Sequence, residues 1–71
     1  MASVKIDEVS ISLFRIDDNK FRAKVKDKNV ESEYIFTKLP NGKYEVNAEI
    51  NNKLSLSISQ GIEYSVERGV L

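Results

Sequence analysis

The sequence predicts an all-β fold, a single small antiparallel meander of about six strands closed as a β-sandwich or a small β-barrel. Apolar and polar residues alternate in the runs 21–26, 44–50, 54–59 and 62–67. Alternation with a period of two is the pattern of a strand that has one buried face. Turn-forming residues separate the runs, and no apolar stripe with the period of a helix extends over a useful length. These observations together favour strands throughout the chain.

Stretches rich in Asp, Asn, Gly and Pro divide the chain into segments of strand length. We place strands at about 4–16, 20–26, 30–38, 43–50, 53–59 and 62–68. Because these strands share one apolar face, they cannot stay flat and must close into a barrel or fold into a sandwich. The sequence has no internal repeat, linker or low-complexity segment, so residues 1–71 are expected to form a single β domain.

Two loops that end in glycine predict tight hairpins. The loop 40–42 suits a three-residue hairpin with Gly42 in the left-handed conformation. This loop places Phe36 opposite Val46. The loop 59–61 has the same form and predicts a hairpin between the last two strands.

A four-residue loop at 26–29 sets the register of an earlier hairpin. It places Lys24 opposite Glu31 and Arg22 opposite Glu33, on the outer face. Opposite charges directly across a ladder stabilise it by about 0.2–1 kcal/mol each. We therefore expect a basic strand that is neutralised by its acidic neighbour.

The first predicted strand, 4–16, changes phase twice. Ile6 and Val9 are out of step, and Leu13 and Phe14 are adjacent apolar residues. We expect a β-bulge at each break, because a bulge bends a strand at a barrel corner or between two sheets. The expected core consists of Ile6, Val9, Ile11, Leu13 or Phe14, Ile16, Phe21, Ala23, Val25, Val30, Tyr34, Phe36, Tyr44, Val46, Ala48, Ile50, Leu54, Leu56, Ile58, Ile62, Tyr64 and Val66.

The composition excludes most catalytic chemistry. The chain has no Cys and no His, and therefore lacks thiol catalysis, His-dependent triads and the usual zinc ligands. Its 11 basic residues balance 11 acidic ones, which gives no general attraction to nucleic acid or to a membrane surface. Asp17, Asp18 and Asn19 are typical of a hairpin loop, with a loose Ca²⁺ site as the alternative. We expect a protein that is not an enzyme and uses no metal or cofactor.

The N-terminal residues and the overall hydropathy indicate where the protein acts. Asp7 and Glu8 stand where a signal peptide has its apolar stretch. No run approaches the ~20 apolar residues of a membrane span. We expect a cytoplasmic protein, or a component of a virion, that does not contact a membrane.

An aromatic residue followed by Leu-Pro-x-Gly-x-Tyr-x-Val marks the central hairpin. The residues that carry this pattern are Phe36, Leu39, Pro40, Gly42, Tyr44 and Val46. The stretch resembles a hairpin of Ig-like and prealbumin-like β-sandwich modules, such as carboxypeptidase regulatory-like and Cna-B-type domains. The resemblance implies a structural or binding unit.

Two groups of apolar residues indicate a candidate protein interface. The phase changes of the first strand turn some of its residues away from the core, and two residues of the third strand have outward parity. The candidate residues are Val9, Ile11, Leu13, Ile35 and Leu39. Exposed apolar clusters often mark binding sites; the alternative is that a bulged first strand turns the first three inward. We expect a non-enzymatic protein–protein interaction or structural assembly module, a phage or virion accessory subunit included, that presents an edge strand or an apolar surface to a protein or to a second copy. A small inhibitor that binds a host enzyme is a further alternative.

A small nucleic-acid-binding β-barrel is the main alternative of a different class. Its candidate basic face consists of Arg15, Lys20, Arg22, Lys24 and Lys26. Such barrels bind single strands through basic groups and exposed aromatic rings. In this chain most aromatic residues have core parity, and Glu31 and Glu33 neutralise the basic row. We therefore rank a protein partner above nucleic acid.

Overall fold

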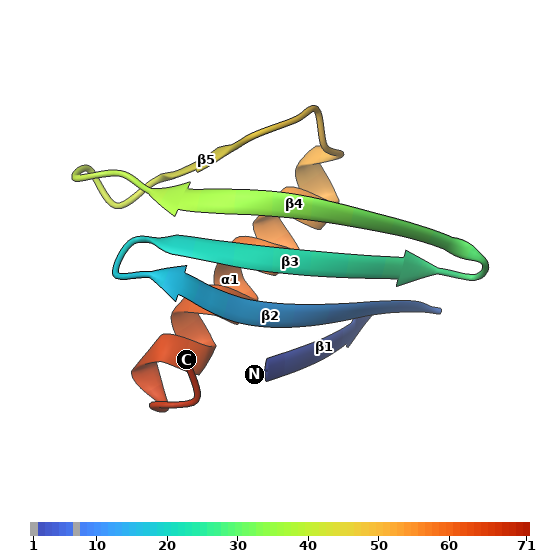
Figure 1. The fold of residues 1–71 in the computed structure, drawn as a ribbon, viewed down its shortest axis with the longest axis horizontal. Coiled ribbons are helices and arrows are strands. Elements are labelled where there is room, and N and C mark those ends of the chain that lie inside the picture. Colours follow the sequence, from blue (N-terminus) through green and yellow to red (C-terminus); the bar gives the residue numbers. More distant parts are fainter. Residues whose placement is uncertain (1, 7) are drawn as a thin grey trace.

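A computed structural model describes residues 2–6 and 8–71, with side chains from Glu8 onward (Figure 1). Within these residues the chain forms one antiparallel sheet with the strand order β1-β2-β3-β4-β5, followed by one α-helix. The elements are β1 (Ala2–Ile6), β2 (Val9–Asp17), β3 (Lys20–Asp27), β4 (Val30–Lys38), β5 (Tyr44–Val46) and α1 (Asn52–Glu67). The helix crosses behind the sheet and covers one of its faces, so the fold has an α layer and a β layer.

The prediction of an all-β meander of about six strands, closed as a sandwich or barrel, is wrong. The segments 53–59 and 62–68, predicted as strands, form α1, and the sheet stays open. The sequence pattern was ambiguous because Leu54, Ile58 and Ile62 recur every four residues, a spacing that satisfies both the strand and the helix period. The apolar face of the sheet decides the outcome, because it needs a second layer to cover it.

Hydrogen bonds cap both ends of α1. The Asn51 side chain caps the first turn by accepting hydrogen bonds from the Lys53 and Leu54 amides at 2.9 and 3.3 Å. Gly69 adopts a left-handed conformation, with φ of +76°, just beyond the last turn. The amide of Val70 then donates to the Ser65 carbonyl at 2.8 Å, which satisfies a carbonyl that the helix leaves free.

The core lies between α1 and the covered face of the sheet. Its buried apolar residues are Ile11, Leu13, Phe21, Ala23, Val25, Phe36, Ile58 and Ile62. All belong to the predicted core, Leu13 as one of two alternatives with Phe14. Four predicted core residues are instead exposed large hydrophobics, namely Ile16, Val30, Leu56 and Tyr64. Leu56 and Tyr64 lie on the outer side of α1, because a helix separates residues that a strand would place on one face. Ala48, also predicted as core, is exposed, and the side chain of Ile6 lies outside the described residues.

Three hairpins were predicted, and their outcomes differ. The hairpin at 59–61 is wrong, because these residues lie within α1. Phe36 pairs with Val46 and Gly42 has a φ of +86°, as predicted. The hairpin between β3 and β4, however, closes with a turn at Lys28-Asn29 and pairs Lys24 with Glu33. The predicted register is therefore wrong by two residues. A shift of two keeps every side chain on its face, and because charges repeat every second residue in both strands, opposite charges still meet.

The first predicted strand is two strands. β1 pairs with β2 as a hairpin with Ile6 opposite Val9, so the first phase change is a reversal of the chain and not a bulge. Asp7 lies outside the described residues. The register irregularity in β2 falls between Arg15 and Asp17, and not at the predicted position. Leu13 and Phe14 simply point to opposite faces of the sheet.

A polar cluster ties α1 to the end of the sheet. The Tyr44 hydroxyl donates to Glu63 Oε1 at 3.0 Å, and Lys38 Nζ lies 2.9 Å from the same oxygen. Burial and the adjacent carboxylate of Glu63 raise the pKa of Tyr44 to about 12, so the phenol stays a donor at neutral pH. The Tyr44 ring also meets the edges of Phe21 and Phe36, with centroid distances of 6.4 and 6.3 Å.

Truncating two apolar residues of α1 tests whether this segment is a helix and not a strand. Ile58 is 0% exposed and Leu56 is 60% exposed. We expect Ile58→Ala to lower the free energy of unfolding by about 2–5 kcal/mol and Leu56→Ala to lower it by less than ~1 kcal/mol, measured by urea unfolding. In a strand the two side chains would share a face, so equal losses would contradict the helix.

The Glu63 cluster predicts a pH dependence. The hydrogen bond from Lys38 is the main reason that the pKa of Glu63 is lowered, and the hydroxyl of Tyr44 adds to it. A carboxylate whose pKa is lowered by folding stabilises the fold at pH values above the pKa that it has in the unfolded chain. This contribution is lost as the pH falls through the pKa that the group has in the folded protein. We expect Glu63→Gln to be less stable than wild type at pH 7 by no more than about 1 kcal/mol, because both charges are partly solvated. The difference should vanish in acid; an unchanged difference in urea titrations at low pH would contradict the assignment.

Candidate functional site

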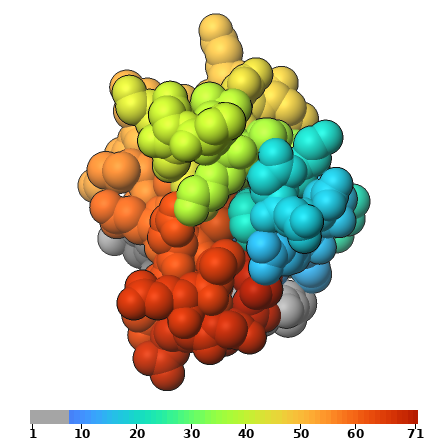
Figure 2. Space-filling model, turned by 90° about the vertical axis from the view of Figure 1, so that its left-hand side faces the viewer, coloured from blue at the N-terminus to red at the C-terminus, as the bar shows by residue number. Residues whose placement is uncertain are grey.

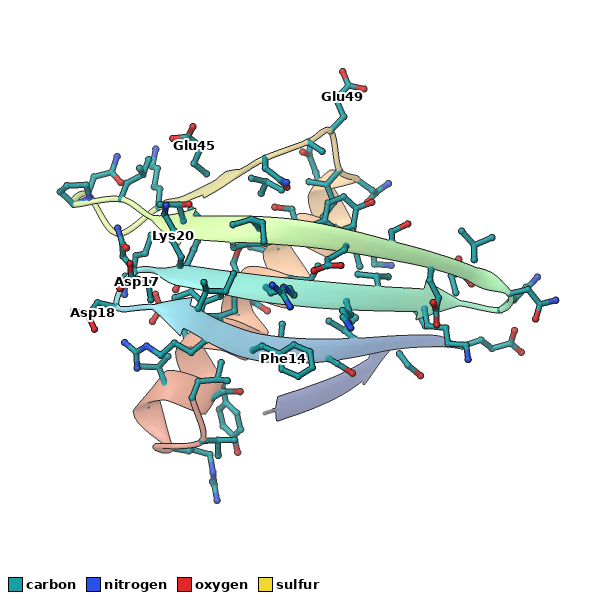
Figure 3. All side chains as sticks on the ribbon, viewed as in Figure 1. Phe14, Asp17, Asp18, Lys20, Glu45 and Glu49 are labelled. Carbon is teal, nitrogen blue, oxygen red and sulfur yellow. The ribbon has the colours of Figure 1, made fainter. Side chains whose placement is uncertain are left out.

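The face of the sheet opposite α1 is not covered by any described element. We call it the open face, and it consists of Ser10, Ser12, Phe14, Arg22, Lys24, Lys26, Glu31, Glu33 and Ile35. Figure 2 shows the two layers end on, with the orange and red helix against one side of the green, cyan and blue strands. Figure 3 looks straight at the open face and shows Phe14 lying over β2.

Cross-strand pairing arranges the charges of the open face in rows. Lys24 lies opposite Glu33, and Lys26 lies opposite Glu31. Arg22 reaches diagonally to Glu33, with Nε 2.7 Å from Oε1. A shallow hollow of about 450 Å³ follows these rows between β2 and β4. The arrangement is polar, and the basic row of β3 lies beside the acidic row of β4.

One row of the open face is apolar at both ends. Phe14 on β2 and Ile35 on β4 are half-buried and lie on either side of Arg22 on β3. Aromatic residues and arginine often carry much of the binding energy at protein interfaces. Here both lie in one row with an aliphatic side chain. The sequence left open whether Leu13 or Phe14 is buried; only the register of β2 places Phe14 outside.

The five predicted interface residues do not form one surface. Ile11 and Leu13 are 1% and 0% exposed beneath α1, so their side chains are core and are not available to a partner. Val9 is half-buried and packs against the core. Ile35 lies on the open face, and Leu39 is half-buried at the hairpin loop, where its amide donates to the Lys43 carbonyl.

The basic residues proposed for nucleic acid divide between two places. Arg22, Lys24 and Lys26 follow β3 along the open face, and Lys24 Nζ lies 5.8 Å from the centroid of the Phe14 ring. Lys20 stands at the first position of β3, beside the Asp17–Asn19 turn (Figure 3). Arg15 belongs to a different site.

Arg15 has the parity of the covered face and ties the C-terminus to the sheet. Its guanidinium lies 5.5 Å from the centroid of the Phe21 ring and donates to the carbonyls of Asp18 and Leu71 at 3.0 and 3.3 Å. A guanidinium held by these contacts stabilises the fold and is directed away from the basic row of β3.

The edge of the sheet at β4 is a second feature of the surface. β4 runs from Val30 to Lys38, but β5 pairs only with its second half. The Asn47 side chain ends the pairing by accepting the Ile35 amide at 2.9 Å, and the chain then leaves the sheet toward α1 (Figure 1). We call Val30–Tyr34 the free edge, because no described residue pairs with it on the side away from β3. The prediction of a strand over 43–50 missed this edge.

The direction of the free backbone groups follows from the ladder. In an antiparallel sheet, the N–H and C=O of one residue point to the same neighbour, and successive residues alternate. The Ile35 carbonyl accepts the Asn47 amide at 3.2 Å, so Ile35 faces the β5 side. By alternation, the backbone groups of Glu31 and Glu33 point outward from the free edge, while those of Ser32 and Tyr34 bond to β3. The edge thus offers two donors and two acceptors that lack a protein partner among the described residues.

The described part of the chain shows neither a metal-binding cluster nor a membrane-spanning helix. No group of three or more His, Cys, Asp or Glu side chains there is arranged to hold a metal ion, the Asp17-Asp18 loop included. None of the helices in these residues has the length and apolar character to cross a membrane.

Comparison with known proteins does not indicate a function for this chain. The chain matches no protein-family model, no curated protein and no solved structure. The resemblance of the 36–46 hairpin to Ig-like and prealbumin-like modules stays a prediction about sequence. The described fold differs from a sandwich because a helix supplies its second layer.

Amide hydrogen exchange tests the free edge without any ligand. We expect the amides of Glu31 and Glu33 to exchange quickly, and those of Ser32 and Tyr34 to exchange at least about 100-fold more slowly, because only the latter are bonded within the sheet. Two-dimensional NMR after transfer to D₂O measures each rate. Equal protection at all four positions would show that this edge is covered.

Proposed function

We propose that the protein is a non-enzymatic protein-binding module whose partner adds to the free edge of β4 and contacts the adjoining open face. The observation that carries the proposal is the outward backbone of Glu31 and Glu33 in the first half of β4, which has no partner among the described residues. An extended segment of another protein binds such an edge through main-chain hydrogen bonds, and its side chains then supply specificity. An assembly subunit and an inhibitor of a larger protein are two roles that use such a surface.

The open face supports the same proposal. Side chains of Glu31 and Glu33 lie on it, so a segment added at the edge continues the face and its rows of charge. The Phe14–Arg22–Ile35 row crosses the neighbouring strands and gives a partly apolar anchor for the remainder of the partner. Edge and face therefore form one continuous surface on β2, β3 and β4.

A proline substitution tests whether the edge binds the partner. Glu31→Pro removes an N–H that points outward from the sheet, and it leaves the bonds between β3 and β4 in place. Glu31→Thr removes the same charge but keeps the N–H, and is the matched control. We expect wild type and Glu31→Thr to capture the same specific protein from an extract of the encoding organism, and Glu31→Pro to lose it by about tenfold or more.

Controls make this experiment decisive. Circular dichroism and thermal unfolding must show that both variants keep the fold. Capture of the partner by Glu31→Pro at the wild-type level would exclude the free edge as the binding site. Substituting Phe14→Ala in the same assay measures the contribution of the open face; loss with Phe14→Ala alone would place the site on the face.

Nucleic acid is a second candidate, and one observation favours it. Arg22, Lys24 and Lys26 lie on the same face as the accessible ring of Phe14, as in sheets that stack bases. Glu31 and Glu33 stand directly across from two of these lysines, which reduces the local positive potential. We expect no binding of single-stranded oligonucleotides tighter than about 100 μM at 200 mM salt. Micromolar binding with a steep salt dependence, abolished by Lys24→Glu, would reverse this ranking.

A further inference from the structure

We propose that the segment which adds to the free edge of β4 is an extended strand of a different protein, with Lys or Arg at alternate positions and small apolar residues between them. This inference rests on the proposed function and specifies the chemistry of the partner. It follows from the charges of Val30–Tyr34, from the face to which each of its side chains points, and from its pairing with β3.

The charges of the free edge select basic residues. Glu31 and Glu33 are exposed, and their backbone groups point outward from the edge. A strand that bonds to these groups places its own residues directly opposite both carboxylates, on the open face. Opposite charges at such positions stabilise a ladder, whereas like charges destabilise it. The occupant therefore carries positive side chains two residues apart.

Alternation along β4 selects apolar residues between the basic residues of the partner strand. Val30 and Tyr34 have the parity of the covered face, where Tyr34 packs against the core. Val30 is 64% exposed although its side chain is fully apolar. A strand added at this edge would place the residues between its lysines beside Val30, Ser32 and Tyr34. Apolar side chains at these positions would remove apolar surface from water, which stabilises the complex.

The chain already contains a strand of this kind on the other side of β4. In β3, Lys24 and Lys26 lie opposite Glu33 and Glu31, and Ala23 and Val25 lie on the covered face. The structure thus shows how Val30–Tyr34 pairs with an alternating basic and apolar sequence. Because β3 is the central strand and is paired on both sides, it is not itself available to a second molecule.

The segment Val30–Tyr34 of a second copy does not fit the same edge. Two copies of Val30–Tyr34 in antiparallel pairing place glutamates opposite one another in each register that keeps the faces aligned. Centring on Ser32 sets Glu31 against Glu33 of the other copy, and centring on either glutamate sets that residue against itself. Charged residues on an edge are a common means of preventing such self-pairing.

Two synthetic peptides test the proposal. The first has the sequence of β3, Lys20–Asp27, and the second has glutamate in place of its lysines at 24 and 26. In NMR titrations of the labelled protein we expect the β3 peptide to shift and protect the amides of Glu31 and Glu33. The acidic peptide should bind roughly tenfold more weakly, or more so, because two favourable cross-strand pairs become repulsive.

Two variants separate edge binding from charge selection. Glu31→Pro should lose the β3 peptide, because it removes an outward N–H. Glu31→Gln combined with Glu33→Gln should keep edge binding and reduce the preference between the peptides to about twofold or less. Circular dichroism confirms that each variant is folded before it is titrated.

Each other outcome overturns the inference in a distinguishable way. Equal affinity for both peptides at the edge would leave the protein-binding function standing and refute charge selection. Shifts confined to the Phe14 row would move the site to the open face. No binding of the β3 peptide at millimolar concentration would refute the basic partner, while the capture assay with Glu31→Pro decides the proposed function separately. Self-association that Glu31→Pro abolishes, measured by sedimentation, would make the occupant a second copy.

Discussion

The apolar face of the sheet is the constraint on which the rest of this structure depends. Ile11, Leu13, Phe21, Ala23 and Phe36 project from three neighbouring strands, and an exposed surface of that size is costly in water. The helix α1 removes it from water with Ile58 and Ile62, both fully buried. Covering this face with one helix also determines which face stays open, and so where a partner gains access.

The path of the chain from the sheet to α1 explains the free edge. After Val46 the chain must leave the sheet to reach the covered face, so β5 is short. The Asn47 side chain substitutes for a ladder partner at Ile35. Beyond it, the first half of β4 has no neighbour among the described residues on the side away from β3. The binding surface that we propose is thus a by-product of the layer arrangement. Its glutamates limit which strands can use it.

Predictions from the sequence succeeded where the pattern had one interpretation and failed where it had two. The hairpin at Gly42 was correctly predicted, because its left-handed glycine and apolar alternation allow few alternatives. The charges of Arg22, Lys24, Glu31 and Glu33 agreed with two registers, since they repeat with the same period as the pleat. Their agreement therefore did not test the register. The spacing of Ile58 and Ile62 was equally compatible with helix and strand.

The sequence by itself determined which residues of β3 and β4 share a face, because alternation is a local property of the chain. It also determined the lack of thiol and imidazole chemistry. The tertiary structure decided that 52–67 is a helix, since an open sheet requires a covering layer and a helix with small residues such as Ser65 packs closely upon it. It alone decided that Phe14 lies outside and that Glu31 and Glu33 stand at an edge, because both depend on which strands are neighbours and not on any local pattern.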